Sequence, residues 1–408
     1  MAFVNQLLKS GVYLTALVGF FTLLPSQHND TFTHFSNVPE KALIGPLALN
    51  EKLSGASKLF ENQIKGPEGL IYYNNTLYST IHLGNVIKIV DDQIIPIAKF
   101  GKPCDGIYEE HICGRPLGIT TDNKGFLYVA DAYYGIFKIN VNSSNNYGAK
   151  EQIVSMEDVI DGVRPKLPNS VAVSSDGTIY WTDSDSHYAL HDGVYTILVD
   201  GTGRLIKYDS KLKKNTVLMK NLHFANGIEL SDDESFILVA ETLKFRVHKY
   251  YLKGPKAGES SIFIDGLPGM PDNIKRIGQW FYLPLVLHRN TFYSKIGEYP
   301  TLRMMATKSL GLLDQTFQIL DSFYPNIFLK KAAHWVGHFE SLSFLNQLTK
   351  PRLTILKVNE KGTIISSWHS TTGEVFGICE VEVIDDKLYL ASPFNNFLGV
   401  IKLPHGFL

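Results

Sequence analysis

Five polar side chains stand at or beside matched points of a recurring sequence pattern, and all of them offer oxygen atoms as ligands. They are Glu68, Asn169, Asn226, Asp272 and Asn273. Carboxylates and carboxamides without a thiol or a histidine suit a hard cation. Mixed charge and flexible geometry favour Ca²⁺ over Mg²⁺, and the lack of His and Cys disfavours Zn²⁺. The sequence therefore predicts a calcium site. The alternative is that these residues only satisfy turn backbones.

The pattern is clearest between Phe224 and Thr242, which reads FANGIELSDDESFILVAET. A polar start at Asn226 leads into a short strand, Ile228–Leu230. A polar turn follows, and a second apolar strand runs from Phe236 to Ala240. Two strands around a polar turn predict a β-hairpin.

Related stretches recur along the chain at intervals of roughly 50 residues, a period typical of propeller blades. They begin near residues 66, 115, 168, 224 and 271, with a less regular unit near 376. We therefore expect an all-β fold, a six-bladed β-propeller. In such a ring the innermost strand of each blade lines the central channel, so the five polar residues should converge. An ordinary β-sandwich is the alternative.

The regions outside the regular repeats suggest three additions to the propeller. Residues 11–24 carry no charge, which suits a secretory signal or an uncleaved signal-anchor within residues 1–25. Residues 26–60 are expected to be a stalk and lead-in, part of which supplies a closing strand for the propeller of residues 61–408. A helical pattern at about 284–349 is expected to form a lid insertion.

Composition and small motifs point to a secretory route. The net charge is −1 and there is no long basic run, so nucleic-acid binding has no electrostatic basis. Cys104 and Cys113 lie nine apart in one loop, where a disulfide is expected; a metal pair remains open. Cys379 is expected to be a free core thiol. The expected glycosylation sites are Asn29, Asn74 and Asn142.

Several segments resemble the strictosidine synthase-like branch of the calcium-dependent six-bladed propellers, a wider group that includes paraoxonases and gluconolactonases. They read GPEGL, LPNSVAVSSDG, FANGIELSDD and GMPDNI, together with CGRPLGITTDNKGFLYVADAYYGIFKI. The resemblance covers residues 50–408 and includes the Cys104/Cys113 loop. It implies a calcium ion at the channel centre that polarises an ester or lactone oxygen, with Asp272 as base or nucleophile.

The resemblance has one gap. The histidine pair of paraoxonases has no match at Asp131-Ala132, and the remaining candidates, His82, His111, His187 and His338, are expected at the surface or in the insertion. We therefore expect a membrane-anchored, lumenal or extracellular, calcium-dependent hydrolase of aryl esters or lactones. The alternatives are a non-catalytic binding or receptor-like propeller, and a condensing enzyme whose catalytic glutamate has no match here.

Overall fold

The computed structural model describes residues 19–24, 28–142, 145–339 and 351–408. The chain divides into two compact units. The larger unit comprises Val38–Leu190, Gly201–Arg289 and Ser343–Leu408, and the smaller comprises Met1–Asn37, His191–Asp200 and Asn290–Leu342. The predicted N-terminal anchor falls mostly on residues outside the described ranges. No helix within those ranges is both long and apolar enough to span a bilayer.

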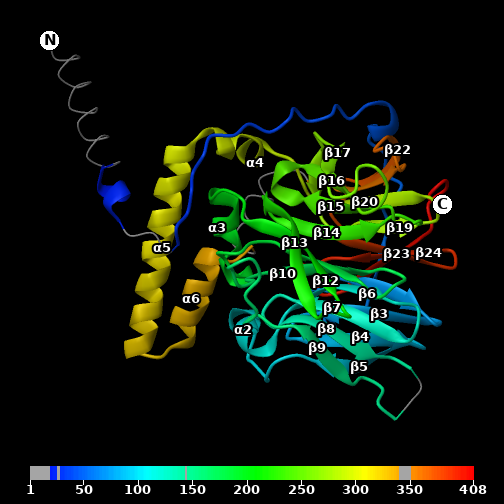
Figure 1. Ribbon diagram of the computed structural model, residues 1–408, viewed down its shortest axis with the longest axis horizontal. Helices are drawn as coiled ribbons and strands as arrows, with labels where there is room; N and C mark the ends of the chain where they lie inside the picture. Colours follow the sequence, from blue (N-terminus) through cyan, green and yellow to red (C-terminus); the bar gives the residue numbers. More distant parts are fainter. Residues whose placement is uncertain (1–18, 25–27, 143–144, 340–350) are drawn as a thin grey trace. The chain divides into compact units, whose positions relative to one another are not determined.

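The larger unit is built from antiparallel sheets, six of them within the described residues (Figure 1). Five of the sheets take their strands in chain order, which is consistent with a propeller. The sheets are β2 (Leu70–Tyr73), β3 (Thr76–Ile81), β4 (Asn85–Val90), β5 (Gln93–Lys99); β6 (Pro116–Thr121), β7 (Phe126–Asp131), β8 (Gly135–Asn140), β9 (Lys150–Val154); β10 (Pro168–Val173), β11 (Ile179–Asp183), β12 (Gly203–Asp209), β13 (Lys214–Leu222); β14 (Ala225–Leu230), β15 (Phe236–Glu241), β16 (Arg246–Tyr251), β17 (Ser260–Ile264); β18 (Gly269–Pro271), β19 (Lys275–Ile277), β20 (Trp280–His288), β21 (Leu353–Val358), β22 (Ile364–Ser370); and β23 (Glu380–Ile384), β24 (Lys387–Ala391), β25 (Leu398–Lys402), β1 (Ser57–Leu59).

One strand from each sheet contacts its neighbours in a closed cycle; four of these are the first strand of their sheet in sequence, and the other two are β19 and β23. β2 contacts β6 and β23, β10 contacts β6 and β14, and β19 contacts β14 and β23. Residues near the start of these strands therefore come from distant parts of the sequence and face a shared centre. Short helical turns lie in the connections of this unit: η1 (Gly45–Leu47), η2 (Ile107–Glu109), α2 (Glu110–Cys113) and η4 (Thr242–Lys244).

The hairpin predicted between Phe224 and Thr242 is confirmed. β14 pairs with β15 in antiparallel register, with Ile228 opposite Val239. Every residue of β15 is buried, as expected for an apolar strand enclosed on both faces. Between the strands, Asp233 accepts a hydrogen bond from the Ser235 backbone N–H at 2.9 Å, which closes the turn.

The last sheet joins both ends of the larger unit. β1, from the predicted lead-in, pairs with β25, with Lys58 opposite Gly399. Near the C-terminus Phe407 is fully buried and stacks on Tyr282 at 4.6 Å between ring centroids. The Nζ of Lys357 donates to the Phe407 carbonyl at 2.9 Å. The first and last segments of the larger unit are therefore both packed into its structure.

The smaller unit is helical. It contains α3 (Gly193–Leu198), α4 (Thr291–Lys295), η5 (Ile296–Glu298), α5 (Pro300–Phe323) and α6 (Ile327–Gly337), and it includes part of η3 (Leu190–Asp192). α5 and α6 lie side by side (Figure 1). The predicted helical pattern is present, but it starts later than residue 284. β20 continues to His288 because Leu285 pairs with Pro271 on one side and with Thr354 on the other.

Candidate metal centre

The five predicted ligands all lie in the larger unit, at or near the starts of neighbouring inner strands. Glu68 precedes β2, Asn169 is in β10, Asn226 is in β14, and Asp272 with Asn273 connects β18 to β19. Each is buried, with between 2% and 8% of its surface exposed. They are thus withdrawn from bulk water, as a channel site requires.

Direct contacts join four of the five. The Asn273 side-chain amide donates to Glu68 Oε1 at 3.1 Å, which links residues 205 positions apart. The Asn226 side chain hydrogen-bonds the Asp272 carboxyl. The backbone N–H of Gly227 donates to the Asp272 carbonyl at 3.2 Å, so the two strands are also tied through the main chain. Asn169 belongs to the set through its strand, because β10 contacts β14.

Three buried oxygens of this set have no hydrogen-bond partner among the described residues. They are Glu68 Oε2, Asn169 Oδ1 and Asn226 Oδ1. A buried acceptor left unpaired costs about 1–3 kcal/mol, so three from neighbouring strands require an explanation. A cation with oxygen ligands fits them, because all three atoms are acceptors. In the described part of the chain, no three His, Cys, Asp or Glu side chains are grouped to hold a metal ion, so carboxamides must complete any site.

The charges of the site give a second reason for a cation. Burial raises the pKa of Glu68, although Arg115 and the hydrogen bond from Asn273 oppose the rise. Burial also raises the pKa of Asp272 well above its usual value, and the charge of Glu68 raises it further. Two carboxyl groups that repel each other in a dry site are stabilised as carboxylates when a cation lies between them.

A buried thiol lies beside this centre. Cys379 Sγ donates to the Glu68 carbonyl at 3.3 Å and is fully buried, which confirms the expected free core thiol. Burial, followed by the charges of Glu68 and Asp272, raises the pKa of Cys379 well above its usual value. Since the thiolate is the reactive form, Cys379 is unsuited to act as a nucleophile here.

Glycines bring the inner strands close enough to share the centre. A Cβ on Gly118 would lie 2.8 Å from the Asn169 carbonyl oxygen. A Cβ on Gly227 would lie 2.4 Å from both the Asn273 Cα and the Asp272 carbonyl oxygen. These neighbours are backbone atoms, which cannot rotate away, so glycine is required where one inner strand meets the next.

Replacing Gly227 with alanine is therefore expected to destabilise the fold and to disturb the centre together. The added methyl group must push β14 away from the Asp272–Asn273 segment, and overpacking of this kind costs about 1–3 kcal/mol. Urea unfolding measures the change. Gly106→Ala is the matched control, because there the nearest atoms belong to the Tyr108 side chain. Equal stability of the two variants would contradict this account.

Threonine hydroxyls from two second strands, and one that directly follows a second strand, hydrogen-bond to the same backbones. Thr80 Oγ1 accepts from the Gly69 N–H at 2.8 Å and donates to the Leu117 carbonyl at 2.6 Å. Thr182 Oγ1 donates to the Asn226 carbonyl at 2.9 Å. Thr242 Oγ1 donates to the Pro271 carbonyl at 2.8 Å. Sequence reasoning missed these residues, although Thr80 and Thr182 occupy similar places near the ends of their apolar strands.

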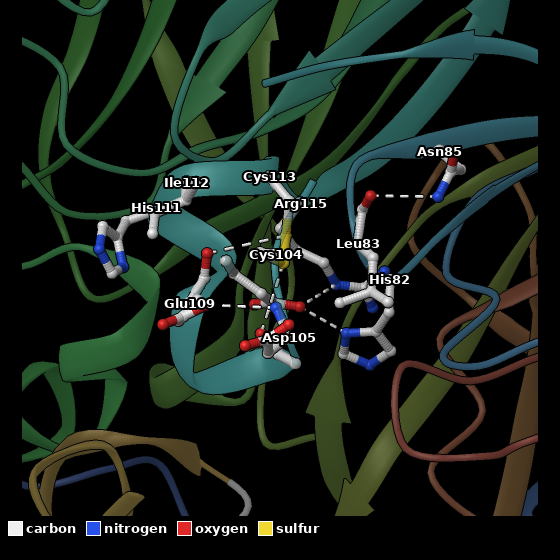
Figure 2. The surroundings of a disulfide bond; sticks show 12 residues. His82, Leu83, Asn85, Cys104, Asp105, Glu109, His111, Ile112, Cys113 and Arg115 are labelled. Carbon is white, nitrogen blue, oxygen red and sulfur yellow. Dashed lines mark hydrogen bonds and ion pairs between the residues drawn. A yellow bond between two sulfur atoms is a disulfide. The ribbon is translucent and has the colours of Figure 1, made fainter. Parts of the chain in front are cut away.

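A cluster of three buried polar side chains, Arg115, Glu110 and His82, supports the segment that leads to Glu68. Its central member, Glu110, lies in the loop that the disulfide closes (Figure 2). Arg115 Nη1 donates to the Gly66 carbonyl at 3.0 Å, two residues before Glu68. Glu110, in α2, lies 3.8 Å from Arg115 Nε and 2.5 Å from His82 Nδ1. All three side chains are buried. The expectation that His82 lies at the surface was therefore wrong: it packs between Glu110 and the Pro393 carbonyl.

The remaining sequence-predicted residues have clear positions. Cys104 and Cys113 form the expected disulfide, and α2 ends at Cys113. Asn74 lies in the turn between β2 and β3 with a positive φ of 48°. Asn29, Asn74 and Asn142 are all exposed, as glycosylation would require.

Comparisons with known proteins place this geometry in context. The strictosidine synthase family model matches residues 169–255, and the strictosidine synthase-like N-terminal model matches residues 45–89. The adipocyte plasma membrane-associated protein of Homo sapiens is 33% identical over 95% of this chain and 86% of its own length. The protein of Gallus gallus is 32% identical over 89% and 81%. The Drosophila melanogaster relative, Hemomucin, is 39% identical over 93% of this chain, which spans 66% of that longer protein.

Solved structures share the fold at low sequence identity. A gluconolactonase from Xanthomonas campestris superposes with a TM-score of 0.52 and 13% identity, covering 94% of this chain and 99% of its own. A putative gluconolactonase gives a TM-score of 0.51 and 12% identity, covering 87% and 96%. At this identity the likeness concerns the fold alone.

Proposed function

Because this chain belongs to the family of adipocyte plasma membrane-associated proteins, which are strictosidine synthase-like, we propose that it is a calcium-dependent hydrolase of aryl esters or lactones. The proposed site is the centre of a six-bladed propeller. The observation that carries the proposal is the set of unpaired, buried oxygens on Glu68, Asn169 and Asn226, beside Asp272. The fold neighbours described as gluconolactonases are compatible with such chemistry.

The residues would divide the work between binding and catalysis. Glu68, Asn169, Asn226, Asp272 and Asn273 would hold Ca²⁺. When bound, the ion supplies Lewis-acid stabilisation of negative charge on the substrate carbonyl oxygen. Asp272 would accept a proton from the attacking water, or would itself attack the carbonyl carbon.

The hydrogen bonds of the site fix the positions of its two carboxyl groups. Asn226 orients Asp272, and Asn273 orients Glu68. Asn226 and Asn273 would thus both bind the ion and hold a carboxyl group in position. A substitution at either asparagine would therefore also displace a carboxylate.

A second function is favoured by one specific residue. Leu117 stands at the aligned position between Glu68 and Asn169, and it is apolar and 5% exposed. The second unit of the repeat therefore contributes no group for proton transfer at this aligned position. This supports the alternative in which calcium only rigidifies a binding or receptor-like propeller.

Chelation is the experiment that tests the proposal and separates the two functions. If calcium binds only the folded state, a free calcium concentration of about 100 times the Kd stabilises that state by about 2.7 kcal/mol. A chelator is therefore expected to lower the Tm, and calcium but not magnesium should restore it. Under the hydrolase proposal, the rate of phenyl acetate or lactone hydrolysis falls when the chelator lowers the Tm and recovers when calcium restores the Tm. Under the binding proposal, only the Tm responds. If the chelator changes neither the Tm nor the activity, a calcium centre is excluded.

The proposal extends to the setting of the protein. The relatives are named plasma membrane-associated, which supports association of this chain with a membrane. We further propose an uncleaved anchor within residues 1–25, a lumenal or extracellular propeller glycosylated at Asn29, Asn74 and Asn142, and a lid role for the helical insertion. Truncation before residue 26 should make the protein extractable from membranes by alkaline carbonate, as a peripheral protein is, and glycosidase treatment should increase its gel mobility.

A further inference from the structure

The buried positions of helix α5 are mostly polar, whereas its exposed positions include six large apolar side chains. Its buried positions are Arg303, Thr307, Gly311 and Asp314. Arg303 Nη2 reaches Asp200 Oδ1 at 2.8 Å, so the buried charge is paired within the smaller unit. A helix on the surface of a water-soluble domain shows the reverse arrangement, with its apolar stripe turned inward. The exposed apolar side chains of α5 are therefore suited to an apolar medium.

Most of the exposed apolar side chains of α6 and the end of α5 lie where the two helices are joined, and Trp335 lies further along α6, seven residues after Phe328. Phe323 is 73% exposed, Tyr324 77% and Phe328 69%. The cluster, which we call the hairpin patch, comprises Ile319, Phe323, Tyr324, Ile327, Phe328 and Trp335. Ile319 and Phe323 are four residues apart in α5, and Phe328 and Trp335 are seven apart in α6, so each pair shares one helix face. Large exposed clusters of this kind mark interaction sites.

A lipid surface fits the patch through its residue types and its charge. Tyr and Trp are the residues that favour the boundary between water and lipid, and aliphatic side chains supply the buried area. Lys330 and Lys331 lie between Phe328 and Trp335 and are exposed, which favours anionic headgroups. A second copy fits less well, because a two-fold contact through the patch would bring two lysine pairs to one interface.

The N-terminal segment gives an independent link to a membrane. Lys308 Nζ of α5 donates to the Thr22 carbonyl at 2.9 Å and to the Leu24 carbonyl at 2.7 Å. These carbonyls lie at the end of the uncharged stretch of residues 11–24, the expected membrane segment. α5 is thus fastened to the point where that segment would leave the bilayer.

We propose that the hairpin patch inserts into the headgroup region of a bilayer that contains anionic lipid. The hairpin thereby forms a second membrane contact beside the N-terminal segment. Interfacial helices of this type lie about 5–10 Å into the boundary between headgroups and acyl chains. The contact concerns the smaller unit and does not depend on the calcium centre.

Trp335 provides a native probe for this contact. The full chain is reconstituted into vesicles of phosphatidylcholine and phosphatidylserine, with or without bromine near the carboxyl end of the acyl chains. The emission of Trp335 is obtained as the difference between the spectra of the wild type and of Trp335→Phe. Brominated lipid is expected to quench this emission. The double variant Phe323→Asp/Phe328→Asp should lose most of this quenching while remaining in the vesicles through its N-terminus.

Controls separate the patch from general effects. Leu212→Asp is the matched control, because Leu212 is 73% exposed in the larger unit, and its quenching should equal that of the wild type. Vesicles without phosphatidylserine should reduce the quenching. Absence of Trp335 quenching in the wild type would overturn the proposal. Equal quenching in the double variant and the wild type would also overturn it. A double variant that changes only the sedimentation of the protein in detergent would overturn it too, because that result indicates contact between copies.

Discussion

Replacing Asp272 with asparagine is expected to change stability in opposite directions with and without calcium. In chelator the variant should be at least as stable as the wild type, because it removes one of two buried carboxyl groups that repel each other. In calcium the wild type should gain stability, and the variant should gain little. Hydrolysis should fall by roughly 100- to 10,000-fold, the range for a lost acid–base group. Thermal unfolding, calcium calorimetry and lactone hydrolysis measure the three effects.

The control for this variant is Asp232→Asn, which makes the same chemical change at a side chain that is 81% exposed. It should leave all three measurements unchanged. Since burial and the charge of Glu68 raise the pKa of Asp272, protons compete with the cation. The calcium affinity of the wild type should therefore fall as the pH is lowered. A variant at Asp272 that binds calcium as tightly as the wild type would refute the proposed ligand set.

Replacing Arg204 with methionine is expected to cause a larger loss of stability than Gly227→Ala. Arg204 Nη2 lies 2.6 Å from Asp183 Oδ2, and both side chains are buried. Asp183 Oδ1 also accepts the backbone N–H groups of Lys166 and Leu167, which fixes the loop before β10. Without Arg204 the Asp183 carboxyl is left uncompensated, which costs roughly 3–5 kcal/mol in buried pairs. Urea unfolding measures this loss.

An exposed ion pair of similar chemistry provides the comparison. Arg164 Nη1 lies 2.9 Å from Glu157 Oε2, with 60% and 76% of the side chains exposed. Arg164→Met should cost no more than about 1 kcal/mol. The double variant Asp183→Asn/Arg204→Met should recover part of the loss, because no charge of this pair then remains buried. Equal effects of Arg204→Met and Arg164→Met would show that burial does not govern this pair.

The strands and the long helix were predictable because their patterns are local. The alternation around Ser231–Glu234 identifies the β14–β15 hairpin, and helical spacing identifies α5. The end of β20 was not predictable, because Leu285 is held in the strand by partners on both sides. Local propensity does not report such pairing.

The residues that we propose as ligands were identified in the sequence for a different reason. Glu68, Asn169, Asn226 and Asp272 stand at matched points of a repeat, so one alignment reveals them together. Arg115, Glu110 and His82 do not stand at these matched points of the repeat. Their association depends on the Cys104–Cys113 loop, which brings Glu110 to two residues from other segments. A single sequence contains no pattern that predicts the contact of Glu110 with Arg115 and His82.

The pairing of β1 with β25 has a consequence for how the protein is made. The strand of Ser57–Leu59 emerges from the ribosome long before its partner in Leu398–Lys402, because more than 300 residues separate the two strands. This sheet can therefore form only after β25 has been synthesised, and the unpaired edge must be protected until then. Premature termination upstream of β25 should yield chains that remain bound to chaperones rather than a smaller folded product.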